Sequence, residues 1–359
     1  MAPTTPPPAV TYRRPLPFRL ARRALAVPDR VVQRLAGDPV VVDGRVLHRS
    51  AQLLLEVSER SGRNALEGQD AAARRAAMRQ AASLGMPVAR GLHVSERVMP
   101  GPESPLRLRV YRPYGAGARP PAIVYFHGGG WVVGDLDTHD GSCRVLARTA
   151  GCVVVSVEYR LAPEHPHPAA VDDCLAAYRW LVANATDLSL DDRAVALMGD
   201  SAGGNLAAVV ARLARDLDGP PPVAQGLVYP STDFRMQTPS QAMFADGFFL
   251  TRASMDWFRD QYLPSPGLTE DPLVSPLLAT DLSGVAPAWV WTGGFDPLRD
   301  EGSDYADALE KAGVEVRRRC YDDQVHGFFG MGVLPGGLEV IEEMGRHMGE
   351  LVRDAARAR

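Results

Sequence analysis

The stretch Gly199-Asp200-Ser201-Ala202-Gly203-Gly204 determines how the rest of the chain is interpreted. The apolar run before it, residues 194–198 (AVALM), predicts a buried strand. The run after it, residues 205–213 (NLAAVVARL), contains neither glycine nor proline and predicts a helix. Ser201 is therefore expected on a sharp turn between a strand and a helix.

Gly199 and Gly203 flank this serine in the G-x-S-x-G pattern of a nucleophile elbow, where the glycines keep side chains away from the junction of strand and helix. The serine hydroxyl then stands at a helix N-terminus, whose amides and dipole favour negative charge. Taken alone, the pattern fits equally well a glycine–serine turn that merely ends a strand. The interpretation of Ser201 as a nucleophile therefore depends on the rest of the chain.

Strands and helices alternate through most of the sequence. The 359 residues are 46% hydrophobic and 23% charged, which is ordinary for a globular protein with a large core. Strands are predicted at 106–111, 122–126, 153–157, 224–229, 288–292 and 314–320, and helices at 140–150, 169–185, 301–312 and 338–356. This alternation predicts an α/β fold with a mostly parallel sheet covered by helices on both faces.

Two regions depart from that alternation and set the expected domain boundaries. Residues 1–90 contain little strand signal; the first ten are proline-rich and expected to be disordered or extended, and helices are predicted at 50–61 and 70–84. Residues 231–276 interrupt the alternation just past a strand end, where open α/β sheets place their ligands. The core is thus expected in two parts, 91–230 and 277–359.

Charge and cysteine content exclude several classes of protein. The formal net charge of −4 gives no reason to expect a nucleic-acid partner, and no apolar run approaches the length of a membrane span or forms a signal peptide. The four cysteines lack C-x-x-C spacing and are expected to be reduced thiols of a cytoplasmic protein. His165 and His167 lie between prolines with no further ligand to complete a metal site, so no metal is predicted.

The arginine-rich segment at residues 12–35 has two interpretations. It could form a helix on a membrane surface, or an ordinary helix with a solvated arginine face. Pro15, Pro17 and Pro28 interrupt any long amphipathic helix, which favours the second interpretation. A membrane-surface partner is therefore not expected from the sequence.

A glycine run follows the predicted strand at 122–126. In residues 127–131 (HGGGW), three glycines allow the backbone to approach a substrate closely and present amides to it. Such a run supplies the oxyanion hole of lipases and esterases, and we assign the donors to Gly128 and Gly129, with the Ala202 amide as a third. A phosphate-binding loop is the alternative, but the Lys-Ser/Thr ending of a P-loop and the G-x-G-x-x-G spacing are missing.

A serine nucleophile needs a base and a group that orients the base. His326 comes soon after the strand predicted at 314–320, whereas His347 lies in a polar helical stretch and is expected at the surface. Asp296 is the first carboxylate after the strand at 288–292, and Asp300 and Glu301 fit the first turn of the next helix instead. The chain order serine, aspartate, histidine is that of α/β-hydrolases.

Together with the EYRLAPE run at residues 158–164, in which Arg160 is expected to pair with a carboxylate, these motifs resemble the hormone-sensitive-lipase-like (bacterial family IV) carboxylesterases. The resemblance implies an α/β-hydrolase core with a helical cap formed by residues 1–90 and 231–276. It further implies a serine carboxylesterase that cleaves short- to medium-chain esters through an acyl-enzyme intermediate, without a cofactor. Dimers are frequent in this family, which allows a homodimer here.

Substrate contacts and rival functions remain open at this point. Trp131 beside the glycine run is a candidate pocket residue; Phe244 and Phe248 in the insertion could line the pocket or form the core of the cap. An amidase or arylformamidase with the same triad is an alternative activity. A small-molecule receptor on the same fold is another, although such binding relatives characteristically lack the histidine that His326 provides.

Overall fold

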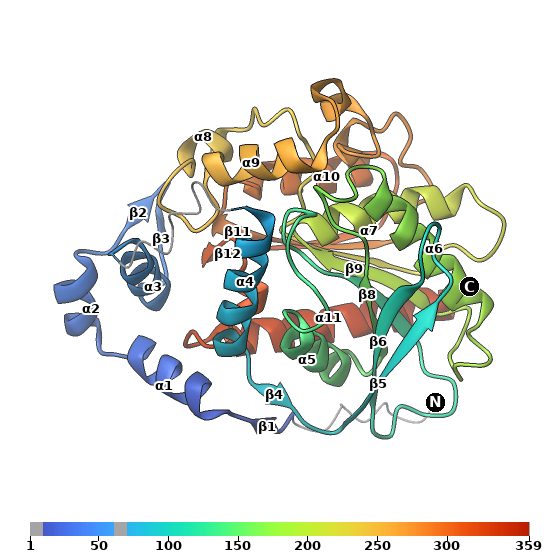
Figure 1. Cartoon of the computed structure of the whole chain (residues 1–359), viewed down its shortest axis with the longest axis horizontal. Helices are drawn as coiled ribbons and strands as arrows, with labels where there is room; N and C mark the ends of the chain where they lie inside the picture. The colour runs from blue at the N-terminus through green and yellow to red at the C-terminus, as the bar shows by residue number, and fades with distance from the viewer. Residues whose placement is uncertain (1–9, 61–69, 359) are drawn as a thin grey trace.

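An eight-stranded sheet forms the centre of the computed structural model, which describes residues 10–60 and 70–358 (Figure 1). The strand order is β12-β11-β10-β9-β7-β8-β6-β5, and all neighbours from β8 to β12 are parallel, whereas β6 runs antiparallel to β5 and β8. The strands are β5 Leu92–Met99, β6 Leu106–Pro113, β7 Ala122–Phe126, β8 Val153–Glu158, β9 Val195–Asp200, β10 Gln225–Val228, β11 Ala288–Phe295 and β12 Val316–Val325. The predicted α/β fold is confirmed.

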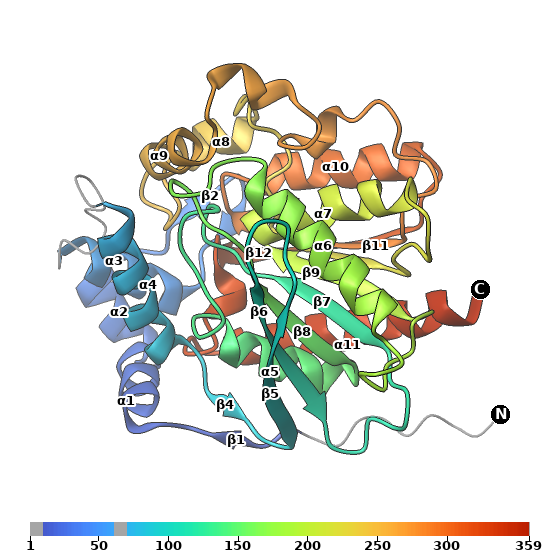
Figure 2. The same cartoon turned by 45° about the vertical axis from the view of Figure 1, so that its right-hand side comes forward.

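Helices cover both faces of this sheet (Figures 1 and 2). One face packs against α5 Asp140–Ala150 and α11 Gly337–Ala358, and the other against α6 Ala169–Ala183, α7 Ala202–Arg215 and α10 Arg299–Lys311. All five residues of β7 are buried, and they alternate between the two apolar clusters. A central parallel strand is therefore apolar along its whole length, as its sequence indicated.

The N-terminal segment and the insertion lie at the carboxyl ends of the parallel strands. The first contributes α1 Leu16–Leu25, α2 Asp29–Ala36, α3 Arg49–Arg60, α4 Ala71–Gly85 and the short strands β1 Tyr12–Arg13, β2 Val41–Val42, β3 Arg45–Val46 and β4 Val88–Ala89. The second contributes α8 Pro239–Met243, α9 Arg252–Tyr262, η1 Pro266–Glu270 and η2 Pro276–Leu278. A third apolar cluster joins Phe18 of α1 to Phe244 of the insertion and to Phe295 and Val325 at the ends of β11 and β12.

Most predicted elements are observed within a few residues of their expected bounds. The helices expected at 50–61 and 70–84 are α3 and α4, and the arginine-rich segment forms two helices separated around Pro28. The extended character expected for residues 1–9 lies outside the described residues. The boundaries at 90, 231 and 277 stay predictions.

Candidate active site

Ser201 occupies the turn between β9 and α7 in a backbone conformation that side chains rarely adopt, with φ 55° and ψ −118°. A Cβ on Gly199 would lie 2.2 Å from the Gly203 carbonyl oxygen, and one on Gly203 would lie 2.0 Å from the carbonyl oxygen of Phe126. Backbone therefore fills the space on both sides of the turn. This close approach is the physical reason for glycine at both positions.

A continuous hydrogen-bonded chain links the three residues predicted to act together. His326 Nε2 lies 2.9 Å from Ser201 Oγ, and His326 Nδ1 lies 2.8 Å from Asp296 Oδ2. Asp296 is fully buried, and its other carboxylate oxygen accepts a 2.8 Å hydrogen bond from the Leu298 amide. The carboxylate is thus held on one side by backbone and on the other by the imidazole. Ser201, His326 and Asp296 therefore lie within hydrogen-bonding reach of one another, the geometry that serine hydrolysis requires.

The strands place these groups at one edge of the sheet. β11 ends at Phe295, so Asp296 is the next residue, and β12 ends at Val325, immediately before His326. The sequence indicated an end of β12 near residue 320, but the strand continues through a polar run to Val325. Along this run its pairing with β11 shifts register between Gly293 and Phe295 of β11. The extra length brings His326 directly to the carboxyl edge of the sheet.

The glycine run after β7 faces this edge, but the amide of its first glycine, Gly128, already donates a hydrogen bond within the protein. Gly128 is buried, and its amide donates a 2.9 Å hydrogen bond to Asp200 Oδ1. Gly129 and Gly130 are partly exposed, and their amides, like that of Ala202, donate no hydrogen bond among the described residues. This hydrogen bond argues against Gly128 as an oxyanion donor, and the donor roles of Gly129 and Ala202 stay predictions.

Asp200, which sequence reasoning did not single out, organises this part of the site. Besides the Gly128 amide, its carboxylate accepts hydrogen bonds from the Tyr125 and Tyr229 hydroxyls and lies 3.5 Å from His139 Nε2. Burial alone would raise the pKa of Asp200, but the contacts to His139, Tyr125 and Gly128 outweigh it and hold the pKa below its ordinary value. Its position directly before the nucleophile was the available signal.

The comparison with protein families decides which group the fold belongs to. A family model described as an alpha/beta hydrolase fold matches residues 123–330, more than half of the chain. The chain is also 48% identical over 311 residues to the carboxylic ester hydrolase LipN of Mycobacterium tuberculosis, covering 84% of this chain and 82% of that one. The chain belongs to the hormone-sensitive-lipase-like group of alpha/beta hydrolases.

Other members of the family show the same likeness. An ethyl acetate hydrolase of Pseudomonas putida is 41% identical over 254 residues, covering 68% of this chain and 79% of that one. Among solved structures, an ester hydrolase from the metagenome of Lake Arreo, complexed with a bipyridine phosphonate derivative, has a TM-score of 0.81 and 41% identity, and covers 85% of this chain and 98% of its own. A thermostable esterase from Pseudomonas putida has a TM-score of 0.82 at 34% identity, with coverage of 85% and 98%.

Within this family fold, the buried side chain of His127 supports the glycine run at residues 127–131. It is fully buried, stacks on Tyr159 with ring centroids 4.2 Å apart, and lies 2.9 Å from the Gly128 carbonyl oxygen through Nδ1. The Tyr159 hydroxyl donates to the His127 carbonyl oxygen at 2.7 Å. Burial, together with nearby His139, lowers the pKa of His127 to about 4, so the ring is neutral at physiological pH.

Aromatic side chains surround the loop on its outer side. Trp131 is buried and stacks on Tyr262 of α9 at 4.5 Å. A Cβ on Gly130 would lie 2.4 Å from the Phe258 ring, so this ring rests directly on the glycine. Phe244 is fully buried in the third apolar cluster, through which α1 packs against the core, and Phe248 is partly buried beside it. Pocket roles for Trp131, Phe244 and Phe248 stay predictions.

Glu301 and Arg160 fix structure around the site. Glu301, expected only to charge the first turn of α10, is fully buried and accepts hydrogen bonds from the Thr232 amide at 2.7 Å and from the Gln241 side chain at 2.5 Å, both in the insertion. Burial raises the pKa of Glu301 to about 8. Arg160 binds the buried Asp173 at 2.8 Å, which confirms the ion pair expected for the 158–164 motif.

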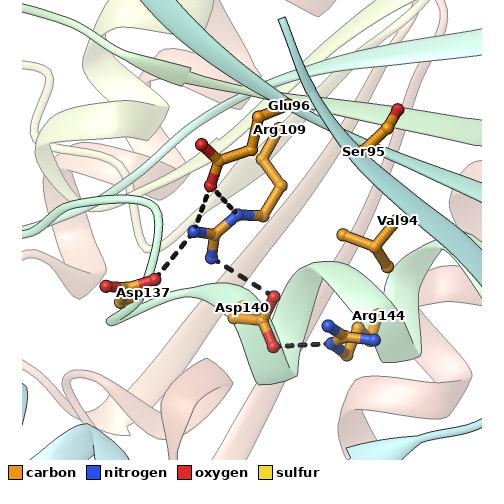
Figure 3. A pocket seen from close by; sticks show the side chains of 7 residues that line it. All are labelled: Val94, Ser95, Glu96, Arg109, Asp137, Asp140 and Arg144. Atoms are coloured by element: carbon orange, nitrogen blue, oxygen red, sulfur yellow. Dashed lines mark hydrogen bonds and ion pairs between the residues drawn. The ribbon is translucent and has the colours of Figure 1, made fainter.

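A hollow of about 510 Å³ lies over β5, β6 and the start of α5 (Figure 3). Its charged side chains are paired with one another: Arg109 lies 2.7 Å from Glu96 and 2.8 Å from Asp137, and Arg144 lies 2.6 Å from Asp140. None of the residues that line it belongs to the serine site. Paired charges of this kind are typical of a structural network and supply no reactive group.

The described residues contain neither a cluster of metal ligands nor a membrane-spanning helix. In residues 10–60 and 70–358, no three His, Cys, Asp or Glu side chains are grouped as metal ligands, and His167 Nδ1 instead lies 3.2 Å from the Tyr262 hydroxyl. Within the same ranges, no helix has both the length and the apolar character needed to cross a bilayer.

Proposed function

We propose that this protein is a serine carboxylesterase that hydrolyses short- to medium-chain carboxylic esters. The observation that carries the proposal is the hydrogen-bonded chain from Asp296 through His326 to Ser201, with distances of 2.8 and 2.9 Å. Relatives named as a carboxylic ester hydrolase and an ethyl acetate hydrolase support the choice of an ester as substrate.

The chemistry begins with transfer of the Ser201 proton. As Oγ attacks the ester carbonyl carbon, His326 Nε2 accepts the hydroxyl proton, and Asp296 holds the imidazole with Nδ1 protonated and Nε2 directed at the serine. The tetrahedral intermediate collapses when the alcohol leaves with the proton from His326. A water molecule then gives a proton to Nε2 and attacks the acyl-serine carbonyl carbon. The second tetrahedral intermediate collapses as His326 returns that proton to Ser201 Oγ, which releases the carboxylic acid and restores Ser201.

The negative charge of the intermediate is assigned to three backbone amides. Gly129, Gly130 and Ala202 have amides without a partner in the described structure, and Gly129 and Gly130 are partly exposed. The Asp200 hydrogen bond to Gly128 holds the first residue of this loop in place. Preorganised donors of this kind typically contribute about 3 to 4 kcal/mol each to transition-state stabilisation.

Size selection is assigned to the ring of Phe258, which rests on Gly130, itself one of the assigned oxyanion donors. Trp131, whose indole stacks on Tyr262, closes the same side. An acyl or alcohol group bound against these rings meets a rigid apolar wall, which favours short to medium chains over long ones.

The test is hydrolysis of p-nitrophenyl esters of increasing chain length by the wild type and by Ser201→Ala. We expect the wild type to cleave the shorter esters, and the variant to lose about a millionfold in kcat, because the nucleophile is removed while the fold is unchanged. Matched anilides separate esterase from amidase activity. A wild type that cleaves the anilides and none of the esters, or an active Ser201→Ala, would refute the proposal.

A further inference from the structure

Helix α1 has a second apolar side that is largely exposed. On its inner side Phe18 and Leu25 are buried against the core. On its outer side Leu16 and Leu20 are 63% and 58% exposed. The spacing of four residues places these two leucines next to one another on the helix surface.

Arginines without a carboxylate partner among the described residues flank these leucines. Residues 10–36 carry seven arginines and one acidic residue, Asp29, a net charge of +6 in a chain whose total is −4, so the remainder carries −10. Arginines elsewhere commonly pair with carboxylates, as Arg109, Arg160 and Arg318 do. Between residues 10 and 36, no arginine lies within 4.0 Å of a carboxylate of the described residues.

The arginines and the leucines share one surface. Arg19 and Arg23 follow Leu16 and Leu20 by three residues each, and both are exposed. Beside this surface, toward the inner side of the helix, a hollow of about 320 Å³ is lined by Arg14, Phe18, Arg19, Arg22, Arg23 and Ala26, and by neither leucine. Guanidinium groups bind phosphate oxygens through paired N–H donors, and so this surface suits phosphate groups beside apolar chains.

We propose that the outer face of α1 binds the surface of an anionic membrane, with Leu16 and Leu20 in the headgroup region and the flanking arginines at lipid phosphates. An apolar stripe flanked by arginines is typical of helices that lie in the membrane interface. The formal charge of +6 on residues 10–36 is complementary to anionic lipid. The sequence favoured a solvated arginine helix; the exposure of both leucines changes that preference.

Membrane binding at α1 would place the lipid surface close to the serine site. Phe18 on the inner face of α1 packs in the same cluster as Phe295 and Val325, the residues directly before Asp296 and His326. Arg22 also donates a 3.1 Å hydrogen bond to the carbonyl oxygen of Gly332, in the loop that follows His326. Esters with acyl chains partition into bilayers; this link to substrate supply rests on the proposed function, whereas the binding itself does not.

Co-sedimentation of the full chain with vesicles tests the proposal. We expect binding to vesicles of equal parts phosphatidylglycerol and phosphatidylcholine, little binding to phosphatidylcholine alone, and weaker binding as salt rises from ~0.05 to ~0.5 M. Each arginine near an anionic surface strengthens binding about fivefold, so Arg19→Glu with Arg23→Glu should weaken it at least ~25-fold. Leu16→Ser with Leu20→Ser should weaken binding at both salt concentrations, because it removes the apolar contribution.

Matched variants elsewhere serve as controls. Arg97→Glu with Arg357→Glu makes the same charge change at exposed sites outside α1, and Val98→Ser with Leu217→Ser removes exposed apolar side chains. These should bind vesicles as the wild type does, and hydrolysis of a dissolved short ester reports that every variant is folded.

Several results would overturn the proposal. They are absent binding, equal binding to neutral vesicles, and equal losses in the control variants. Retention on heparin without vesicle binding would assign the face to another polyanion. Dimerisation that Leu16→Ser with Leu20→Ser abolishes, again without vesicle binding, would assign it to a second copy of this chain.

Discussion

The turn at Ser201 and the helix α1 are held in place in opposite ways. Around the turn, backbone meets backbone: a Cβ on Gly203 would lie 2.0 Å from the Phe126 carbonyl oxygen, and the buried Asp200 binds the loop opposite. Helix α1 is held from one side only, through Phe18 and its neighbours, and its outer face is exposed. The contrast shows that backbone packing fixes the position of the turn, whereas the outer face of α1 is left open to solvent.

The largest expected effect comes from the carboxylate inside the rigid region. Asp296→Asn keeps the shape but presents an amide to His326 Nδ1, so the imidazole no longer holds the tautomer that accepts the serine proton. We expect kcat for a p-nitrophenyl ester to fall about 10⁴-fold. Asp246→Asn, at an exposed site in the insertion, is the control and should be fully active. A comparable loss in both variants would show that the carboxylate has no special role.

Adding one methyl group to the turn should cost the most stability. Gly203→Ala places a Cβ against backbone that has no room to move, and we expect a loss of more than ~4 kcal/mol in the free energy of unfolding or a failure to fold. Gly267→Ala in the insertion meets no atom closer than 3.8 Å and should change that free energy by less than ~1 kcal/mol. Urea unfolding measures both; equal losses would remove the contrast between the two regions.

A smaller effect is expected at Glu301, where the core meets the insertion. Burial raises the pKa of this carboxyl to about 8, although the Thr232 and Asp233 amides oppose the rise. In the unfolded chain the group titrates near 4.5, so between these values the unfolded chain is ionised while the folded chain keeps the proton. Stability from this group is therefore lost as pH rises from about 4.5 to about 8 and changes little above that.

Glu301→Gln removes this titration. Relative to the wild type, the variant should gain stability between pH 5 and 8 by on the order of a few kcal/mol. Thermal unfolding at the two pH values measures it, and Glu270→Gln at an exposed site is the control, which should follow the wild type. If the stabilities of the wild type and of Glu301→Gln changed with pH in parallel, Glu301 would be ionised in the folded protein and the prediction would be wrong.

The buried parts of the molecule were the easiest to predict from the sequence. β7 was predicted at its observed bounds because every residue in it is apolar and buried. The edge strand β5 was missed, since most of its residues are exposed and its sequence shows no apolar run. Local signals identify elements that bury their side chains and overlook those that only complete a sheet edge.

The site was predictable at the level of motifs but not of atoms. Ser201, Asp296 and His326 each follow a strand, so their order and position were visible in the sequence. Which glycine amide is free depends on Asp200, a partner 72 residues away from Gly128, and no local pattern reveals that hydrogen bond. The contact of Phe258 with Gly130 likewise arises only when the insertion folds over the core.

The central claim is that Ser201 is the nucleophile, and covalent labelling tests it most directly. A p-nitrophenyl phosphonate ester reacts with an activated serine and leaves a stable adduct that peptide mass spectrometry locates. We predict one adduct per chain on Ser201, a stoichiometric loss of activity, and strongly reduced labelling in Asp296→Asn. Labelling at another residue, or full activity with Ser201 modified, would contradict the account.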